Sequence, residues 1–298
     1  MTLIMTLLVR DEADIVRENL AFHLARGVDH VIAMDNGSTD GTTEILEEYA
    51  RAGALTLLHE QSDAYLQALW VNRMAAMARE RFAAEWILNN DADEFWRPPD
   101  RPDGAPGDLK AALAGSSSRA LVCRRFNMIA AREAIGTGPW SEKLVWRARR
   151  PVPPPALRDP LHDPLDRPYF LYDLPNKVMV RADGLVEVTK GCHSAVFDPP
   201  ASPEHSAIEI YHFPIRSKAK FEASVAHISC AIARDATLPP GASWKYRRWG
   251  TMLAIDGNIE RAFSETVPSL VETWLWRLRG RMERATCLRD DLRALRAI

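Results

Sequence analysis

Three acidic side chains stand within four positions at the end of a short apolar run. Residues 86–88 are typical of a buried strand, and Asp91, Asp93 and Glu94 follow shortly after it. Carboxylates this close repel one another unless a cation or a shared proton lies among them. Sites for magnesium-type cations use one or two carboxylates together with substrate phosphates. Asp91 and Asp93 are therefore predicted metal ligands, and a solvated acidic turn is the alternative.

Alternating strands and helices must position these carboxylates. Strands are predicted at 2–9, 30–34, 54–58 and 86–89, and helices at 11–26, 42–51 and 64–82. Asp11 is expected to cap the first helix. This alternation with short links predicts an α/β fold with a mainly parallel sheet flanked by helices. The strand ends at Arg10, Asp35 and Asp91 should then share one edge, where open α/β sheets bind ligands.

Composition and motifs exclude several classes of function. The 298 residues carry a net charge of -2, so no overall field attracts nucleic acid. The first strand–helix link, residues 9–13, contains no glycine, which excludes the dinucleotide fingerprint and with it a hydride-transfer enzyme. The four scattered cysteines form no Cys-x-x-Cys pair, as expected of reduced thiols in a cytoplasmic protein. The charges from Arg10 onward end the apolar N-terminus too early for a signal peptide.

The remainder of the chain is predicted to add strands, loops and a helical C-terminus. Further strands are expected at 120–126, 144–147, 176–181, 185–189 and 208–211, with a short helix at 108–114. The proline-rich stretch 151–168 predicts a long loop, either a lid or a surface excursion. Helices are predicted at 219–234, at 244–261 after the Pro239-Pro240-Gly241 break, and at 269–298.

The last predicted helix combines an apolar stripe with many arginines. Leu275, Leu278 and Met282 recur at helical spacing, and arginines such as Arg277 and Arg279 fill much of the rest. A basic amphipathic helix can lie on an anionic membrane or pack on a partner, and the alternative is docking on its own domain. The expected location is the cytoplasm, with peripheral contact at the inner face of the membrane left open.

Three motifs, in this order and spacing, resemble those of family 2-type glycosyltransferases. They are Val9-Arg10-Asp11-Glu12-Ala13-Asp14, Asp35-Asn36-Gly37-Ser38-Thr39-Asp40-Gly41-Thr42 and Asp91-Ala92-Asp93-Glu94-Phe95. The last is similar to the Asp-Ala-Asp-Glu-Phe metal motif of a bacterial branch. Family members usually carry Asn where Asp11 stands. The resemblance covers roughly the first hundred residues. It implies a GT-A fold, a nucleotide-diphosphate-sugar donor, a divalent metal (manganese or magnesium) and inversion at the anomeric carbon.

The same resemblance implies roles for individual residues. Asp35 would contact the base, Asp91 would lie near the ribose and the metal, and Asp93 would bind the metal directly. A late histidine completes the metal shell in many transferases of this fold, and His212 and His193 are the two candidates. The predicted donor-binding residues are Val9, Arg10, Glu12, Asp35, Asn36, Asp91, Lys177 and Arg216.

The predicted reaction moves a sugar, expected from a UDP-sugar, to a hydroxyl of a glycan or other acceptor. The predicted domains are a GT-A catalytic domain at 1–215 and a helical region packed on it at 216–298. Asp93, Glu94 and Glu142 are the catalytic candidates. The base that takes the acceptor proton is left open between Glu94, Glu142, Glu133 and Asp173. The alternatives are a nucleotide-sugar-binding protein without turnover and a haloacid-dehalogenase-like phosphatase, whose Asp-x-Asp motif stands nearer the N-terminus.

Overall fold

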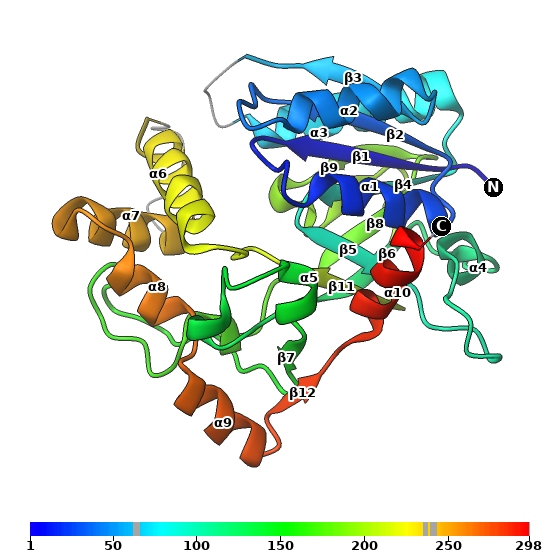
Figure 1. Ribbon diagram of the computed structural model, residues 1–298. Coiled ribbons are helices and arrows are strands. Elements are labelled where there is room, and N and C mark those ends of the chain that lie inside the picture. The colour runs from blue at the N-terminus through cyan, green and yellow to red at the C-terminus, as the bar shows by residue number, and fades with distance from the viewer. Residues whose placement is uncertain (62–65, 235–237, 239–242, 298) are drawn as a thin grey trace. The chain divides into compact units, whose positions relative to one another are not determined.

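The computed structural model describes residues 1–61, 66–234, 238 and 243–297 (Figure 1). The chain divides into two compact units. The first unit consists of Met1–Arg125, Pro175–His212 and Asp291–Ile298, and the second of Phe126–Leu174 and Phe213–Asp290. These units differ from the predicted division at residue 215, because residues 126–174 group with residues 213–290.

An eight-stranded sheet forms the centre of the first unit, in the order β3-β2-β1-β4-β8-β6-β11-β5. The strands are β1 (Leu3–Val9), β2 (His30–Asp35), β3 (Leu55–His59), β4 (Trp86–Asp91), β5 (Glu94–Arg97), β6 (Ala120–Asn127), β8 (Lys177–Arg181) and β11 (Glu204–His212). β3, β2, β1 and β4 are parallel, whereas β8 pairs antiparallel with β4 and β6, and β5 with β11. The predicted α/β fold is confirmed.

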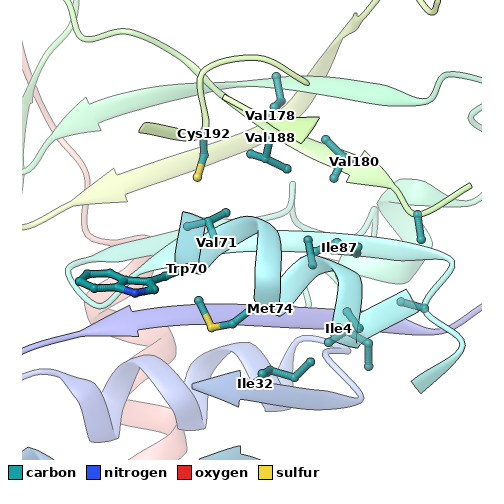
Figure 2. Packing of buried hydrophobic residues seen from close by; sticks show 14 of the residues in the cluster. Ile4, Ile32, Trp70, Val71, Met74, Ile87, Val178, Val180, Val188 and Cys192 are labelled. Atoms are coloured by element: carbon teal, nitrogen blue, oxygen red, sulfur yellow. The ribbon is translucent and has the colours of Figure 1, made fainter. Parts of the chain in front are cut away.

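Helix α3 (Gln67–Phe82) covers the parallel strands and explains their apolar sequences. Its Trp70 and Met74 pack with Ile4 of β1, Ile32 of β2 and Ile87 of β4 in one buried cluster (Figure 2). Parallel strands covered by helices are apolar along most of their length. The first unit also contains α1 (Val16–Ala25), α2 (Thr42–Arg51), α4 (Leu109–Leu113), η3 (Lys190–Cys192) and the pair β9 (Leu185–Val188) and β10 (Ala195–Phe197). The predicted start of the third helix, Ala64, lies outside the described residues.

The first helix begins later than predicted. Asp11 has a φ of 53°, and its carboxylate accepts a hydrogen bond from the backbone N–H of Thr39 at 2.7 Å. Asp11 therefore does not cap the helix, and α1 begins at Val16. The carboxylate of Asp11, which could have capped the helix, joins two loops instead.

The second unit is mainly helical around its own apolar cluster. Its elements include η1 (Arg132–Ala134), α5 (Trp140–Lys143), β7 (Trp146–Ala148), η2 (Tyr169–Leu171), α6 (Lys218–Arg234), α7 (Trp244–Asp256), α8 (Glu260–Thr266), α9 (Leu270–Leu278) and β12 (Met282–Arg284). Phe221 of α6, Trp249 of α7 and Phe263 of α8 share the cluster. In the part of the chain that the structure describes, no helix is long and apolar enough to cross a membrane.

Two predicted C-terminal helices are interrupted at glycines. The helix expected at 244–261 ends at Asp256, because Gly257 takes a left-handed conformation with a φ of 67°. The helix expected at 269–298 is wrong as one element: α9 ends before Gly280, β12 pairs with β7, and α10 (Cys287–Arg296) follows. The apolar spacing continues across Gly280, so periodicity alone did not show the interruption. The Pro239-Pro240-Gly241 break and Ile298 lie outside the described residues.

Candidate active site

The parallel strands bring three of the predicted residues to one edge of the sheet. Val9 of β1 is level with Asp35 of β2, and Leu8 of β1 is level with Asp91 of β4. Arg10 follows β1 directly. The prediction that these three strand ends open on the same edge is therefore confirmed.

The turn after β2, residues 35–43, is shaped by its own acidic residues. Asp35 is buried, and its carboxylate accepts hydrogen bonds from the N–H of Ser38 at 3.0 Å and from the hydroxyl of Thr43. Asp40 accepts from the backbone N–H groups of Thr42 and Ala13, each at 3.1 Å. These carboxylates hold the β2 turn and join it to the loop after β1. Contact of Asp35 with a base stays a prediction.

The loop after β1 is fastened to the β2 turn along its backbone. The N–H of Glu12 donates to the Thr42 hydroxyl at 2.7 Å, and the N–H of Asn36 donates to the carbonyl of Val9 at 2.9 Å. The side chains of Arg10 and Glu12 are half-buried on this loop. Their predicted place in a nucleoside site stays a prediction, on a loop whose backbone is fixed.

A buried ammonium group lies between two carboxylates of the turn after β4, residues 91–94. The Nζ atom of Lys177 lies 2.5 Å from Oδ2 of Asp91 and 2.6 Å from Oε2 of Glu94. Nη1 of Arg125 donates to Oε1 of Glu94 at 2.8 Å. Crowded carboxylates require positive charge, and β8 and β6 supply part of it from within the protein. Lys177 was predicted to bind the donor, but its ammonium is engaged with these two carboxylates.

Burial and charge act in opposite directions on this group of residues. Burial raises the pKa of Glu94, but Lys177 and Arg125 lower it more, so it lies below its usual value. Burial lowers the pKa of Lys177, and Asp91 with Glu94 raises it above its usual value. The carboxylate and both cations thus remain charged.

Glu94 does not suit the role of general base. Its side chain is fully buried, and each carboxylate oxygen is paired with a cation, Oε1 with Arg125 and Oε2 with Lys177. An acceptor hydroxyl has no access to such a group, and the lowered pKa makes it a weak base. The sequence did not show this, because both cations come from strands distant along the chain.

The structure distinguishes the two candidate histidines. Nε2 of His212 lies 3.4 Å from Oδ2 of Asp93. His193 instead donates from Nδ1 to the carbonyl of Asn176 at 2.7 Å. His212 is therefore the histidine that lies beside the predicted metal ligand.

The Asp93–His212 pair fits a divalent metal held partly by its substrate. Magnesium and manganese sites often take only one or two protein side chains, with substrate phosphates completing the shell. Within the described residues, no group of three or more His, Cys, Asp or Glu side chains has the arrangement of a metal site. Asp91 is engaged with Lys177 through Oδ2. Metal binding by Asp93 and His212 stays a prediction.

A buried asparagine fixes the backbone of the β4 turn. Nδ2 of Asn19, on α1, donates to the carbonyls of Ala92 at 2.9 Å and Glu94 at 2.8 Å. Nδ2 of Asn90 donates in turn to Oδ1 of Asn19 at 3.0 Å. Sequence reasoning missed Asn19, although a polar residue four positions after the apolar Ile15 and next to Leu20 was a signal that could have found it.

His23 extends this network one turn along α1. Its Nε2 accepts from the backbone N–H of Trp96 at 3.1 Å, so the ring proton is on Nδ1, which donates to the carbonyl of Asn19 at 2.8 Å. Burial lowers the pKa of His23 to about 4. Nε1 of Trp96 donates to Oδ1 of Asn90 at 2.9 Å. His23 is therefore a neutral structural residue of this network.

The other predicted site residues belong to the second unit. Arg216 is buried and donates from Nη1 to the carbonyl of Phe213 at 2.8 Å. Oε2 of Glu133 accepts from the backbone N–H of Leu270 at 2.9 Å. Glu142 is half-buried on α5, and Asp173 is exposed. Donor binding by Arg216 and base catalysis by these carboxylates stay predictions.

The first part of the chain matches a family of glycosyltransferases. Residues 5–136 match the sequence profile described as glycosyltransferase family 92, a segment that contains all three acidic motifs. Together with the α/β sheet, the match identifies this part of the chain as glycosyltransferase-like. No curated protein matches the chain. The assignment to family 2 stays a prediction.

Several solved structures are distantly similar. The crystal structure of S. aureus TarS 1–349 with UDP has 16% identity, covering 93% of this chain and 78% of that chain, with a TM-score of 0.42. The same protein with UDP-GlcNAc has 15% identity, the same coverage and a TM-score of 0.40. Glucosyl-3-phosphoglycerate synthase from Mycobacterium tuberculosis, with Mn2+ and UDP, has 18% identity, covering 42% of this chain and 44% of that chain, with a TM-score of 0.28. Similarity this low says nothing about the ligands of this chain.

Proposed function

We propose that this protein transfers a sugar from a nucleotide-diphosphate donor, a UDP-sugar, to a hydroxyl of a glycan or another acceptor. One observation carries the proposal. The ends of β1, β2 and β4 place Arg10, Asp35 and Asp91 at one sheet edge, within the segment that matches a glycosyltransferase family. Open α/β sheets bind ligands at this edge. The motifs also support the finer assignment to a family 2-type, inverting enzyme.

The residues of the β4 turn have separate tasks in this proposal. Asp93 and His212 would hold a manganese or magnesium ion, which when bound offsets the negative charge that develops on the leaving diphosphate. Lys177 holds Asp91 in place through a contact of 2.5 Å. Asn19 fixes the carbonyls on both sides of Asp93. Preorganised groups of this kind need no rearrangement during the reaction.

Inversion requires one in-line attack and a base for the acceptor proton. Such a base contributes roughly a hundredfold to ten-thousandfold to the rate. Glu94 is buried and doubly ion-paired, so the proposal assigns the base to an accessible carboxylate. Glu142, Glu133 and Asp173 remain the candidates, and Glu133 already accepts a hydrogen bond at the start of α9.

Thermal unfolding with a panel of nucleotides tests the donor. UDP, GDP, CDP, NAD and ATP would each be added with and without manganese. A ligand at a hundred times its dissociation constant stabilises a protein by about 2.7 kcal/mol. UDP with manganese should raise the unfolding temperature most. An equal response to every nucleotide, or none to UDP, would contradict a UDP-sugar donor.

Substitution of Asp93 tests the metal assignment. Asp93→Asn should lower metal-dependent turnover of the donor by about a hundredfold to a thousandfold, because a stabilising group at the leaving diphosphate is lost. Unfolding in the absence of ligand should not change. Asp183→Asn, at a side chain that is 88% exposed in the same unit, is the matched control and should keep full activity.

Other outcomes distinguish the alternatives. Near-normal activity of Asp93→Asn would overturn the metal assignment. Stabilisation by UDP without hydrolysis or transfer of any donor would indicate a binding protein without turnover. Release of phosphate from simple phosphomonoesters would indicate a phosphatase.

A further inference from the structure

Helix α9 of the second unit exposes a concentration of large apolar side chains. The exposed fractions are 64% for Leu270, 63% for Val271, 56% for Trp274, 36% for Leu275 and 66% for Leu278. The other large apolar side chains exposed in the described residues are scattered over several elements. A cluster of this kind on one short helix is typical of an interaction surface.

These side chains form one face of the helix. Successive residues of an α-helix are rotated by about 100°, so the five side chains span an arc of about 140°. Thr273, on the opposite side, is buried, and Trp276 is half-buried. Trp276 also packs at the edge of the apolar cluster of the second unit. α9 thus packs on its own unit with one face and exposes the other.

Arginines border the exposed face toward its C-terminal end. By the same rotation Arg277 and Arg279 lie on the two sides of the apolar arc, and Arg281 and Arg284 follow. All four are exposed. The guanidinium of Arg277 also stacks on Trp146, 4.1 Å from the ring centroid, which holds its charge beside the helix.

The carboxylates on and near α9 already have hydrogen-bond or ion-pair partners. Glu272 forms a capping box with Ser269, and Glu133 accepts from the N–H of Leu270, both at the N-terminal end. Glu283 pairs with Arg147 at 2.7 Å. The C-terminal half of the surface is therefore positive, which is complementary to an anionic partner.

We propose that α9 binds the surface of a membrane through anionic lipid headgroups. Leucine and tryptophan side chains enter the boundary between headgroups and acyl chains, and arginines beside them attract anionic lipids. Such a contact needs no helix that crosses the membrane. A second copy fits less well, since a standard protein interface uses roughly 20–30 residues on each side and this face has five large apolar ones.

Vesicle sedimentation with the full chain tests the apolar face. Vesicles of phosphatidylcholine alone would be compared with vesicles in which roughly one third is phosphatidylglycerol. The double variant Trp274→Ser with Leu278→Ser should bind the anionic vesicles at least about tenfold more weakly than the unchanged protein. The matched control is Leu69→Ser with Ile255→Ser, at side chains 61% and 68% exposed on α3 and α7. It should bind as the unchanged protein does.

A charge variant tests the choice of lipid. Arg279→Gln should weaken binding to the anionic vesicles by about fivefold, because each arginine near the surface contributes about that factor. Added salt should also weaken binding to the anionic vesicles. All substituted positions are exposed, so the unfolding temperatures should stay unchanged, and that measurement accompanies each variant.

Three results would overturn the proposal. The first is absence of binding to anionic vesicles, and the second is equal loss in the α9 variant and its matched control. The third is equal binding to both kinds of vesicle. Self-association of the unchanged protein without lipid, lost in the α9 variant, would assign the face to a second copy. None of these results affects the donor test, which depends on the first unit.

Discussion

The β2 turn and the β4 turn are both acidic and lie at the same sheet edge, yet they are held by different partners. Asp35 and Asp40 of the β2 turn accept from neutral N–H and hydroxyl groups, within the turn and, for Asp40, also from Ala13 on the loop after β1. Asp91 and Glu94 of the β4 turn meet cations from β6 and β8. Neutral donors satisfy a carboxylate through local geometry, whereas a crowded buried pair needs opposite charge. The same residue type is therefore satisfied by neutral donors in one turn and by opposite charge in the other.

Removal of the central cation should have the largest effect. Lys177→Met leaves two carboxylates without their ammonium partner, one of them fully buried, and should lower the free energy of unfolding by about 3–5 kcal/mol. Denaturant unfolding measures the change. Lys110→Met is the matched control, because Lys110 also lies 2.5 Å from a carboxylate, that of Asp29, but is partly exposed. It should lose less than about 1 kcal/mol. Equal losses would mean that burial does not increase the stability that a carboxylate gains from its cation.

Acidification should weaken the network around the β4 turn next most strongly. Burial lowers the pKa of His23 to about 4, below its ordinary value of 6.5. Below the ordinary value the unfolded chain binds a proton that the folded protein does not, so stability falls as the pH drops from 6.5 toward 4. The share of His23 is about 3 kcal/mol. The free energy of unfolding, followed over this pH range, measures it.

A variant measures how much of this pH dependence comes from His23. His23→Gln keeps hydrogen-bonding groups but cannot titrate, so its stability should depend less on pH between 6.5 and 4. His30→Gln is the comparison, because His30 is half-buried and its pKa is lowered less deeply by burial. An unchanged pH dependence in His23→Gln would show that the proton binds elsewhere. If His23→Gln does not fold, proton NMR of the unchanged protein still reports whether the imidazole of His23 is neutral at pH 5.5, between the two values.

Loss of a carboxylate from the β2 turn should have the smallest effect. Asp40→Ala removes the acceptor of the Thr42 and Ala13 N–H groups and should cost about 1 kcal/mol, as for other capping carboxylates. Asp183→Ala, at an exposed side chain, is the control and should stay within about 0.5 kcal/mol. A loss as large as that of Lys177→Met would mean that the β2 turn also depends on buried charge.

Sequence patterns predicted those strands and helices whose own residues carry a recognisable pattern. The apolar runs of β1, β2 and β4 showed where these strands end, and those ends carry Arg10, Asp35 and Asp91. The interruption at Gly280 was missed, because the apolar spacing of α9 continues into the following residues. Gly280, with a φ of 62°, ends α9 locally, and the residues after it form β12, which pairs with β7 far away along the chain.

Residue types predicted which residues belong to the candidate site, and their contacts in the structure corrected the roles of two of them. Asp93 and His212 were expected together and lie 3.4 Å apart. Glu94 was a candidate base, and Lys177 was expected to bind the donor, but the two are paired with each other. No spacing in the sequence relates a residue of β5 to a residue of β8. The contact arises because β4, whose end leads into the turn with Glu94, lies next to β8 in the sheet.

The sequence by itself determined the strand ends, the position of the β2 turn and the family match, because each is recognised from residue types in their order along the chain. The tertiary structure decided which carboxylates are neutralised, which histidine lies beside Asp93, and which face of α9 is exposed. These depend on burial, which sets the cost of an unpaired charge, and burial arises only when distant segments pack.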